Sequence, residues 1–256
     1  MKLGMPILFE FNSLEENFIL AKKLGLDFVE LNLNFGYCRQ EMEEGKVFDL
    51  LKKYDLEATL HFFDEADMGT YDEVVEAYFD LLRKYINYGK DYVKIVNFHN
   101  NPGPVVTIAG IKNYMYQKEY DTYIKKLISN FKKAKSILDE FNIKMVIENV
   151  DTAKNASFLM DNFVNLSKEG FHFNMDIGHD NIDNDNMFNL MKDNPLILDE
   201  MHVHDGNRKT CHLALGEGNI DIKTYKNLAI KNNAYVVIEV KCSEDLQKSI
   251  PIFRTI

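Results

Sequence analysis

The sequence predicts an α/β fold in which eight parallel strands close into a single (β/α)8 barrel, the TIM barrel. Short apolar runs of strand type alternate eight times with runs of helical periodicity. Such alternation is typical of a parallel sheet, and eight units in 256 residues match the size of this barrel. No linker rich in Pro, Gly and Ser divides the chain, so we expect one domain covering residues 1–256.

The strands are predicted from apolar runs bounded by turn signals. They cover residues 3–9, 27–33, 57–62, 92–99, 143–149, 171–177, 198–204 and 234–240. The alternative is a doubly wound open sheet. The first strand-to-helix turn, residues 10–13, lacks the glycine fingerprint of a dinucleotide site, which argues against that alternative.

The helices are predicted from apolar residues at helical spacing and from signals at their ends. Ser13 and Glu16 fit a capping box, Gly25 ends the first helix, and Gly89 closes a long amphipathic one. A long connection after residue 99 should pass over one end of the fold. The expected helices cover residues 14–24, 41–54, 71–88, about 120–141, 158–166, 187–191 and 221–231, with a last helix capped by Ser243 that reaches the C-terminus.

Composition limits the function classes. The formal net charge is −10 and the pI is about 5.2, which makes nucleic-acid binding through the overall field a poor prospect. Cys38, Cys211 and Cys242 form neither a CxxC motif nor a disulfide framework, which indicates a reducing compartment. The first residues lack the apolar core of a signal peptide, and no apolar run approaches bilayer length. We therefore expect a soluble, cytoplasmic protein without a membrane partner.

Histidines gather where a barrel enzyme places its active site, at the carboxyl ends of the strands. Of the seven histidines, His172 alone sits near a strand start, and the expected helices contain none. Alternate residues of a strand share a face, so His202 and His204 should point the same way. The others lie at or just past strand ends, or in the loop after the seventh strand: His61, His99, His179, His202, His204 and His212.

Carboxylates end several of the same strands. Glu148 and Glu239 stand inside apolar runs, and Asp176 ends the sixth strand. A buried carboxylate has a high desolvation cost unless a cation pairs with it. Two Glu, one Asp and one His would offer mainly hard oxygen donors, which suit Mn²⁺, Mg²⁺ or Co²⁺ and leave Zn²⁺ open.

Taken in order, these strand ends resemble the xylose isomerase-like TIM barrels. This superfamily includes sugar (phosphate) isomerases and epimerases and the endonuclease IV type of DNA-repair enzyme, also called AP endonuclease family 2. The resemblance covers the whole chain. It is carried by Gly25-Leu26-Asp27-Phe28-Val29-Glu30-Leu31, Ile147-Glu148-Asn149, Met175-Asp176-Ile177-Gly178-His179, His202-Val203-His204-Asp205, His212 to Asp221, and Ile238-Glu239.

The resemblance implies a metal site and a substrate site. Its metal ligands would be Glu148, Asp176, His202 and Glu239. We prefer His202 to His204 because the epimerases carry an acidic residue three positions and a substrate-binding Arg six positions after the ligand, as Asp205 and Arg208 stand here. His179 matches a histidine that contacts substrate in the epimerases and binds a further zinc in the endonucleases.

The endonuclease resemblance implies additional metal ligands. Endonucleases of this type use three zinc ions, and His61, His99 and His212 match three of the extra ligands, beside His179. Thr210 stands where the endonucleases have an Asp, which puts the third zinc in doubt. The acidic charge of the chain also weakens this alternative.

The main hypothesis is therefore a divalent-metal-dependent isomerase or epimerase of a small keto-sugar, sugar phosphate or polyol. Glu148 and Glu239 would transfer the proton. The residues expected around the substrate are His179, Arg208, His61, His99 and His204, the last either as a substrate contact or holding a ligand carboxylate. The second hypothesis is a multi-zinc phosphoesterase acting on abasic DNA or a small phosphate ester. The third is a non-catalytic binding barrel. By analogy with the family, the chain is also expected to form a homo-oligomer.

Overall fold

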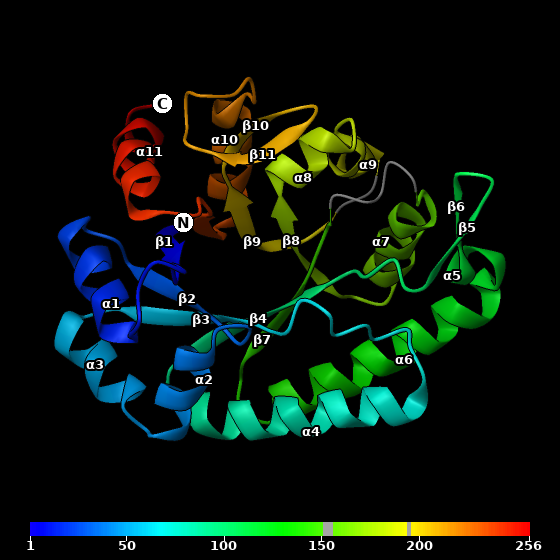
Figure 1. Cartoon of the computed structure of the whole chain (residues 1–256), viewed down its shortest axis with the longest axis horizontal. Helices are drawn as coiled ribbons and strands as arrows, with labels where there is room; N and C mark the ends of the chain where they lie inside the picture. Colours follow the sequence, from blue (N-terminus) through cyan, green and yellow to red (C-terminus); the bar gives the residue numbers. More distant parts are fainter. Residues whose placement is uncertain (151–155, 194–195) are drawn as a thin grey trace.

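A closed barrel of eight parallel strands forms the centre of the molecule (Figure 1). The computed structural model describes residues 1–150, 156–193 and 196–256. Around the barrel the strands follow the order β1-β12-β9-β8-β7-β4-β3-β2, which confirms the predicted fold class. Their bounds are β1 Lys2–Pro6, β2 Phe28–Asn32, β3 Glu57–His61, β4 Val93–His99, β7 Lys144–Glu148, β8 His172–Asp176, β9 Leu198–Val203 and β12 Tyr235–Ile238.

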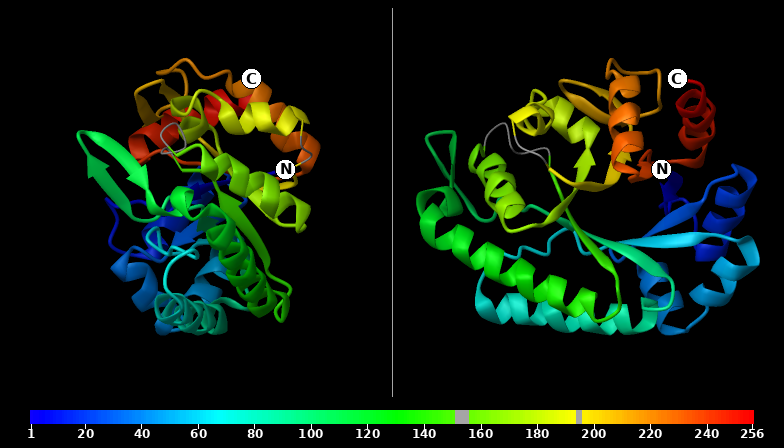
Figure 2. Two further views of the ribbon diagram at one scale, coloured as in Figure 1. Left: turned by 90° about the vertical axis from the view of Figure 1, so that its right-hand side faces the viewer. Right: turned by 180° about the vertical axis from the view of Figure 1, so that it is seen from behind.

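Helices cover the outside of the barrel, and the long helices α4 and α6 pack against each other along one side (Figures 1 and 2). The first helix has the predicted capping box, because the Ser13 side chain accepts from the backbone N–H of Glu16 and the Glu16 carboxylate accepts from the backbone N–H of Ser13. The helices that follow the predicted pattern are α1 Leu14–Lys23, α4 Asp72–Gly89, α6 Tyr120–Asp139, α7 Phe158–Lys168, α9 Asn186–Asp193, α10 Ile222–Asn232 and α11 Ser243–Thr255.

Two helix predictions were wrong in detail. The helix expected over residues 41–54 is two helices, α2 (Gly36–Glu43) and α3 (Val47–Tyr54). Gly45 lies between them with a φ of +72°, a left-handed conformation that ends a helix. In α11 the helix begins at Ser243 itself, so Cys242 occupies the N-cap position and makes no side-chain capping bond.

Two hairpins and two short helices were not predicted. In the long connection after β4, β5 (Val105–Ile108) pairs with β6 (Ile111–Tyr114), and this hairpin projects from the body of the molecule (Figures 1 and 2). The short helix α5 (Met115–Lys118) follows it. Directly after β9, β10 (Asp205–Asn207) pairs with β11 (Thr210–Leu213). The short helix α8 (Ile177–Ile182) starts immediately after β8.

Strand register brings the polar residues of neighbouring strands side by side. Asp176 is paired with His202 across β8 and β9, and His202 is paired with Val237 across β9 and β12. Glu148 pairs with Asn174 across β7 and β8. The site is therefore built on barrel strands, which are fixed by backbone hydrogen bonds on both sides. Among the described residues, no helix is long and apolar enough to cross a membrane.

Candidate active site

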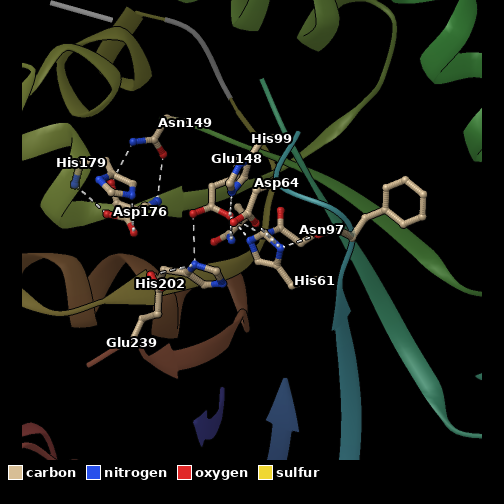
Figure 3. Close-up of polar contacts among 12 residues, drawn as sticks. His61, Asp64, Asn97, His99, Glu148, Asn149, Asp176, His179, His202 and Glu239 are labelled. Atoms are coloured by element: carbon tan, nitrogen blue, oxygen red, sulfur yellow. Dashed lines mark hydrogen bonds and ion pairs between the residues drawn. The ribbon is translucent and has the colours of Figure 1, made fainter. Parts of the chain in front are cut away.

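Four side chains meet at the carboxyl ends of adjacent strands (Figure 3). Glu148 ends β7, Asp176 ends β8, His202 lies one residue before the end of β9, and Glu239 directly follows β12. One potential ligand atom from each lies within 4.8 Å of those of the other three. Three of these side chains are almost completely buried, and Glu239 is 15% exposed. The structure thus brings together the four residues predicted as metal ligands.

The atoms facing one another in this group fit a cation. Nδ1 of His202 lies 3.1 Å from Oε1 of Glu148 and 3.3 Å from Oε2 of Glu239. Yet His202 Nδ1 and Glu239 Oε2 are buried without a hydrogen-bond partner among the described residues. Buried polar atoms of this kind are rare unless something outside the chain satisfies them. Three carboxylates and one imidazole at this spacing match the donor set of a divalent cation.

In the metal-free chain, protonated imidazole supplies the missing positive charge. Burial would raise the pKa of Glu148, but the charge of His202 holds it well below the ordinary range. Burial likewise opposes the low pKa of Glu239, which the charges of Lys241 and His202 hold down. Conversely, burial would lower the pKa of His202, but the charges of Glu148, Glu30 and Glu239 raise it well above 6.5. A metal ion would therefore replace a proton on His202.

Glu30 orients the imidazole of His202 from the barrel interior. Its Oε1 lies 3.1 Å from Nε2 of His202, on the opposite side of the ring from the ligand group. If this carboxylate accepts the Nε2 proton, Nδ1 keeps its lone pair for a metal. Glu30 therefore lies in the position of a hydrogen-bond acceptor for the His202 ring.

Glu200 is a buried acid that the sequence did not single out. It lies two residues before His202 on β9, so both side chains share the inner face of the strand. Both of its carboxyl oxygens are buried without a hydrogen-bond partner among the described residues. Burial, and then the charge of Glu30, raise the pKa of Glu200 to about 8. Glu200 is therefore protonated at neutral pH and adds no second charge beside Glu30.

Replacing Glu200 with Gln is expected to change how stability depends on pH. In the unfolded chain Glu200 ionises near pH 4.5, whereas in the folded chain it keeps its proton to about pH 8. Its contribution to the free energy of unfolding is full below pH 4.5 and is lost as pH rises through this window. Gln does not ionise, so metal-free Glu200→Gln should gain stability relative to wild type between these pH values, measured by urea unfolding. A pH-independent difference would contradict this.

A second group shares Glu148. Nδ1 of His61 donates to the backbone oxygen of Phe62 at 2.8 Å, which leaves Nε2 facing Oε2 of Glu148 at 3.5 Å. Nε2 of His99 lies 3.7 Å from the same oxygen. Ligand atoms of His61, His99 and Glu148 lie within 4.8 Å of one another. Burial would lower the pKa of His61, but Glu148 and Glu30 raise it to about 10, while burial lowers that of His99.

Two asparagines that the sequence did not single out as site residues hold Glu148 in place. Asn97 on β4 and Asn174 on β8 both donate side-chain hydrogen bonds to its Oε2, the latter at 3.2 Å. Lys241 was also missed, and its ammonium lies 2.8 Å from Oε1 of Glu239. Polar residues near strand ends are common, so nothing in the sequence separated these from surface residues.

His204 holds Asp176. Its Nδ1 accepts from the backbone N–H of His212 at 2.8 Å, so the proton is on Nε2, which lies 3.0 Å from both carboxyl oxygens of Asp176. Both ring nitrogens are thus engaged, which favours the carboxylate-holding alternative over a substrate contact. Asn149 fixes the backbone of Asp176, donating to its carbonyl and accepting from its N–H, each at 2.9 Å.

His179 and His212 lie beside this group with Cys211 between two imidazoles. Asp176 caps α8 by accepting from the backbone N–H of His179 at 2.7 Å, and Nε2 of that histidine lies 3.7 Å from Asp176 Oδ2. Hydrogen bonding to His179, and then to His212, lowers the pKa of the Cys211 thiol to about 6. Thr210 is exposed. Cys211, the residue after Thr210, therefore supplies the side chain that faces His179 and His212.

Arg208 is not part of the cluster. Its guanidinium donates to the backbone oxygen of Asn181 at 2.7 Å and pairs with Asp185 at 2.6 Å, and the side chain is half exposed. It lines a separate cavity of about 390 Å³ over α8, α9 and α10. No contact described in the structure joins Arg208 to the four predicted ligands. Its role in binding substrate stays a prediction.

Comparison with known proteins agrees with the architecture. The family model of the xylose isomerase-like TIM barrel matches residues 18–255. An uncharacterized protein of Methanocaldococcus jannaschii is 28% identical over 221 residues, covering 82% of this chain and 80% of that protein. A D-tagatose 3-epimerase-like protein superposes with a TM-score of 0.78 at 21% identity, covering 99% of this chain and 96% of that one. For 3-keto-D-glucoside 4-epimerase from E. coli the TM-score is 0.74 at 17% identity, with both chains fully covered. The chain belongs to the xylose isomerase-like TIM barrel family.

Proposed function

We propose that the protein is a divalent-metal-dependent isomerase or epimerase of a small keto-sugar, sugar phosphate or polyol. The observation that carries this proposal is that two carboxylates of the buried ligand group, those of Glu148 and Glu239, lie 3.1 Å and 3.3 Å from Nδ1 of His202 at the carboxyl ends of the strands. Similar folds described as D-tagatose 3-epimerase-like, 3-keto-D-glucoside 4-epimerase and D-psicose 3-epimerase support a sugar substrate.

Glu148, Asp176, His202 and Glu239 would hold the metal ion. When bound, the ion would polarise the substrate carbonyl and an adjacent hydroxyl. Glu148 and Glu239 would flank the reacting carbon, one removing a proton to give an enediolate and the other returning it. The low pKa of both groups keeps them in the base form at neutral pH. Asn97 and Asn174 would hold the Glu148 carboxylate toward the substrate. The side chains that would border the substrate are His61, His99 and His179.

Solvent deuterium exchange tests this proposal directly. The protein loaded with Mn²⁺ or Co²⁺ would be incubated in D2O with ketopentoses, ketohexoses and their phosphates, and carbon-bound deuterium followed by NMR. We expect exchange next to the carbonyl of at least one substrate, and loss of exchange in Glu239→Gln. Full metal loading without exchange on any member of the panel would count against a proton-transfer enzyme.

Metal binding is expected to release protons and to strengthen as pH rises. His202 has a pKa well above 6.5 in the metal-free chain, so it is protonated at pH 7 and must lose that proton to bind a metal. For each released proton, the apparent affinity should rise about tenfold per pH unit. Calorimetry in buffers of different ionisation enthalpy counts the released protons. An affinity independent of pH between 6 and 8 would contradict the protonated ground state.

The shared carboxylate of Glu148 favours one alternative function. The His61–His99–Glu148 group could hold a further ion beside the first, as in a phosphoesterase with two or three zinc ions. Metal content separates the two functions. About one divalent ion per chain, lost in His202→Ala and kept in His61→Ala, supports the isomerase or epimerase. Two or three zinc ions, together with cleavage of an abasic-site oligonucleotide, would support the phosphoesterase.

A further inference from the structure

We propose that the barrel interior, below the four predicted metal ligands, binds a monovalent cation such as Na⁺ or K⁺ between Glu30 and Glu200. The side chains that would bind it come from three strands, with Glu30 on β2, Thr59 on β3 and Glu200 on β9. One potential ligand atom each from Glu30, Glu200 and His202 lies within 4.8 Å of those of the other two. The site does not depend on which reaction the barrel performs.

This part of the interior is polar where the interior of a TIM barrel is usually apolar. Bulky branched apolar side chains normally fill the inside of such a barrel. Here Glu30 and Thr59 are paired across β2 and β3, and Asn174 and Glu200 are paired across β8 and β9. The exposed fraction of each of these four residues, which we call the polar layer, is 2% or less. Burying so many polar groups costs free energy unless bound partners compensate for it.

Four oxygens of the polar layer are available to a ligand. Both carboxyl oxygens of Glu200, the hydroxyl oxygen of Thr59 and Oδ1 of Asn174 are buried without a hydrogen-bond partner among the described residues. The Thr59 hydroxyl faces Glu200, since it counters part of the rise that burial causes in the pKa of this acid. Buried polar atoms without partners are rare in native proteins. Their grouping around one acid therefore points to a bound ligand.

The donors and the neighbouring charges favour a monovalent cation. Carboxylate, hydroxyl and amide oxygens are hard ligands that suit hard cations. Oε1 of Glu30 lies 3.1 Å from Nε2 of His202, whose Nδ1 faces the predicted metal ligands. A second divalent ion this close to the first would be strongly repelled. A single positive charge only exchanges for the proton that Glu200 otherwise carries.

Aromatic rings close the polar layer on the side away from the barrel mouth. Phe28 lies two residues before Glu30 and shares its face of β2, and Tyr235 pairs with Glu200 across β9 and β12. The two rings pack edge to face with 5.0 Å between their centroids, and Phe28 is fully buried. A cation above these rings would be shielded from bulk water on this side, which strengthens its attraction to the carboxylates.

Selective stabilisation by Na⁺ or K⁺ tests the proposal. The full-length protein, with and without saturating Mn²⁺, would be unfolded by urea at a fixed pH in NaCl, KCl or N-methylglucamine chloride of equal ionic strength. We expect one of the alkali cations to stabilise the protein beyond the organic cation. This excess should grow with the logarithm of the cation concentration above its dissociation constant. Equal stability in the three salts would overturn the proposal.

Thr59→Val and Glu200→Gln locate the site. Valine is close to threonine in shape but lacks the hydroxyl, so Thr59→Val should fold and lose about 10–100-fold in cation affinity, as when a residue that supports a metal site is changed. Glu200→Gln cannot carry the negative charge and should abolish the selective stabilisation. Thr107→Val, on the exposed strand β5, is the matched control and should behave as wild type. Selective stabilisation that persists at wild-type affinity in either Thr59→Val or Glu200→Gln would overturn the proposal, whichever activity is found.

Discussion

Glu148→Gln is expected to lower the rate of proton transfer by about 10²–10⁴-fold, the usual contribution of a positioned acid or base. Gln keeps the shape of the side chain but cannot remove a proton and is a weaker metal ligand than a carboxylate. Since Glu148 contacts His202, His61 and His99, the loss of its charge should also weaken metal binding. Deuterium exchange in D2O and calorimetric metal titration would measure the two effects.

The matched control for this variant is Glu169→Gln, which removes a carboxylate from an exposed ion pair with Lys132, between the end of α7 and the start of β8. Exposed pairs contribute little to stability, so rate and metal affinity should stay at wild-type values. A Glu148→Gln protein that exchanges deuterium at the wild-type rate would remove Glu148 from the proposed chemistry. A loss of exchange in Glu169→Gln would indicate an unspecific effect.

The second large effect is expected from Gly178→Ala. Gly178 lies in the first turn of α8, and a Cβ added there would stand 1.8 Å from Cε1 and 2.3 Å from Nδ1 of His204. The ring of His204 is fully buried and cannot move aside without losing its contacts with Asp176 and His212. Overpacking of this kind costs about 1–3 kcal/mol, and misplacing a residue that supports a ligand typically costs 10–100-fold in metal affinity.

Gly36→Ala serves as the control for Gly178→Ala. Gly36 also lies in the first turn of a helix, α2, but its added Cβ would meet nothing closer than a flexible Arg39 nitrogen at 4.0 Å. Urea unfolding and metal titration of both variants separate the general effect of alanine in a helix from the clash with His204. Wild-type metal affinity in Gly178→Ala would show that His204 does not position Asp176.

The barrel could be predicted because the sequence signals for each strand and helix are local and recur along the chain. Eight alternations of strand and helix carry the fold class, and register within a parallel barrel brings strand ends together. That is why Glu148, Asp176 and His202 could be expected to meet before their distances were known. The break at Gly45 was missed because the apolar pattern continues on both sides of a single left-handed residue.

The parts of the site that depend on loop geometry could not be predicted. The resemblance to the epimerases implied a substrate contact for Arg208, and what it could not give is the β10–β11 hairpin that sets the Arg208 guanidinium beside Asp185. The same hairpin turns Cys211, rather than Thr210, toward His179. Hairpin register depends on turn type and bulges, and the bulge between Asp205 and Asn207 leaves no clear signal in the sequence.

The β5–β6 hairpin should open locally at a lower free energy than the strands of the barrel. It pairs only two strands, and Val106, Ile108 and Ile111 are exposed on it. A two-stranded ribbon with little buried apolar surface is marginally stable alone. Its backbone amide hydrogens should therefore exchange with solvent through local opening, whereas those of β7 and β9 should exchange only through global unfolding. An insertion at its tip, residues 109–110, would thus alter this arm with little effect on the cooperative unfolding of the barrel.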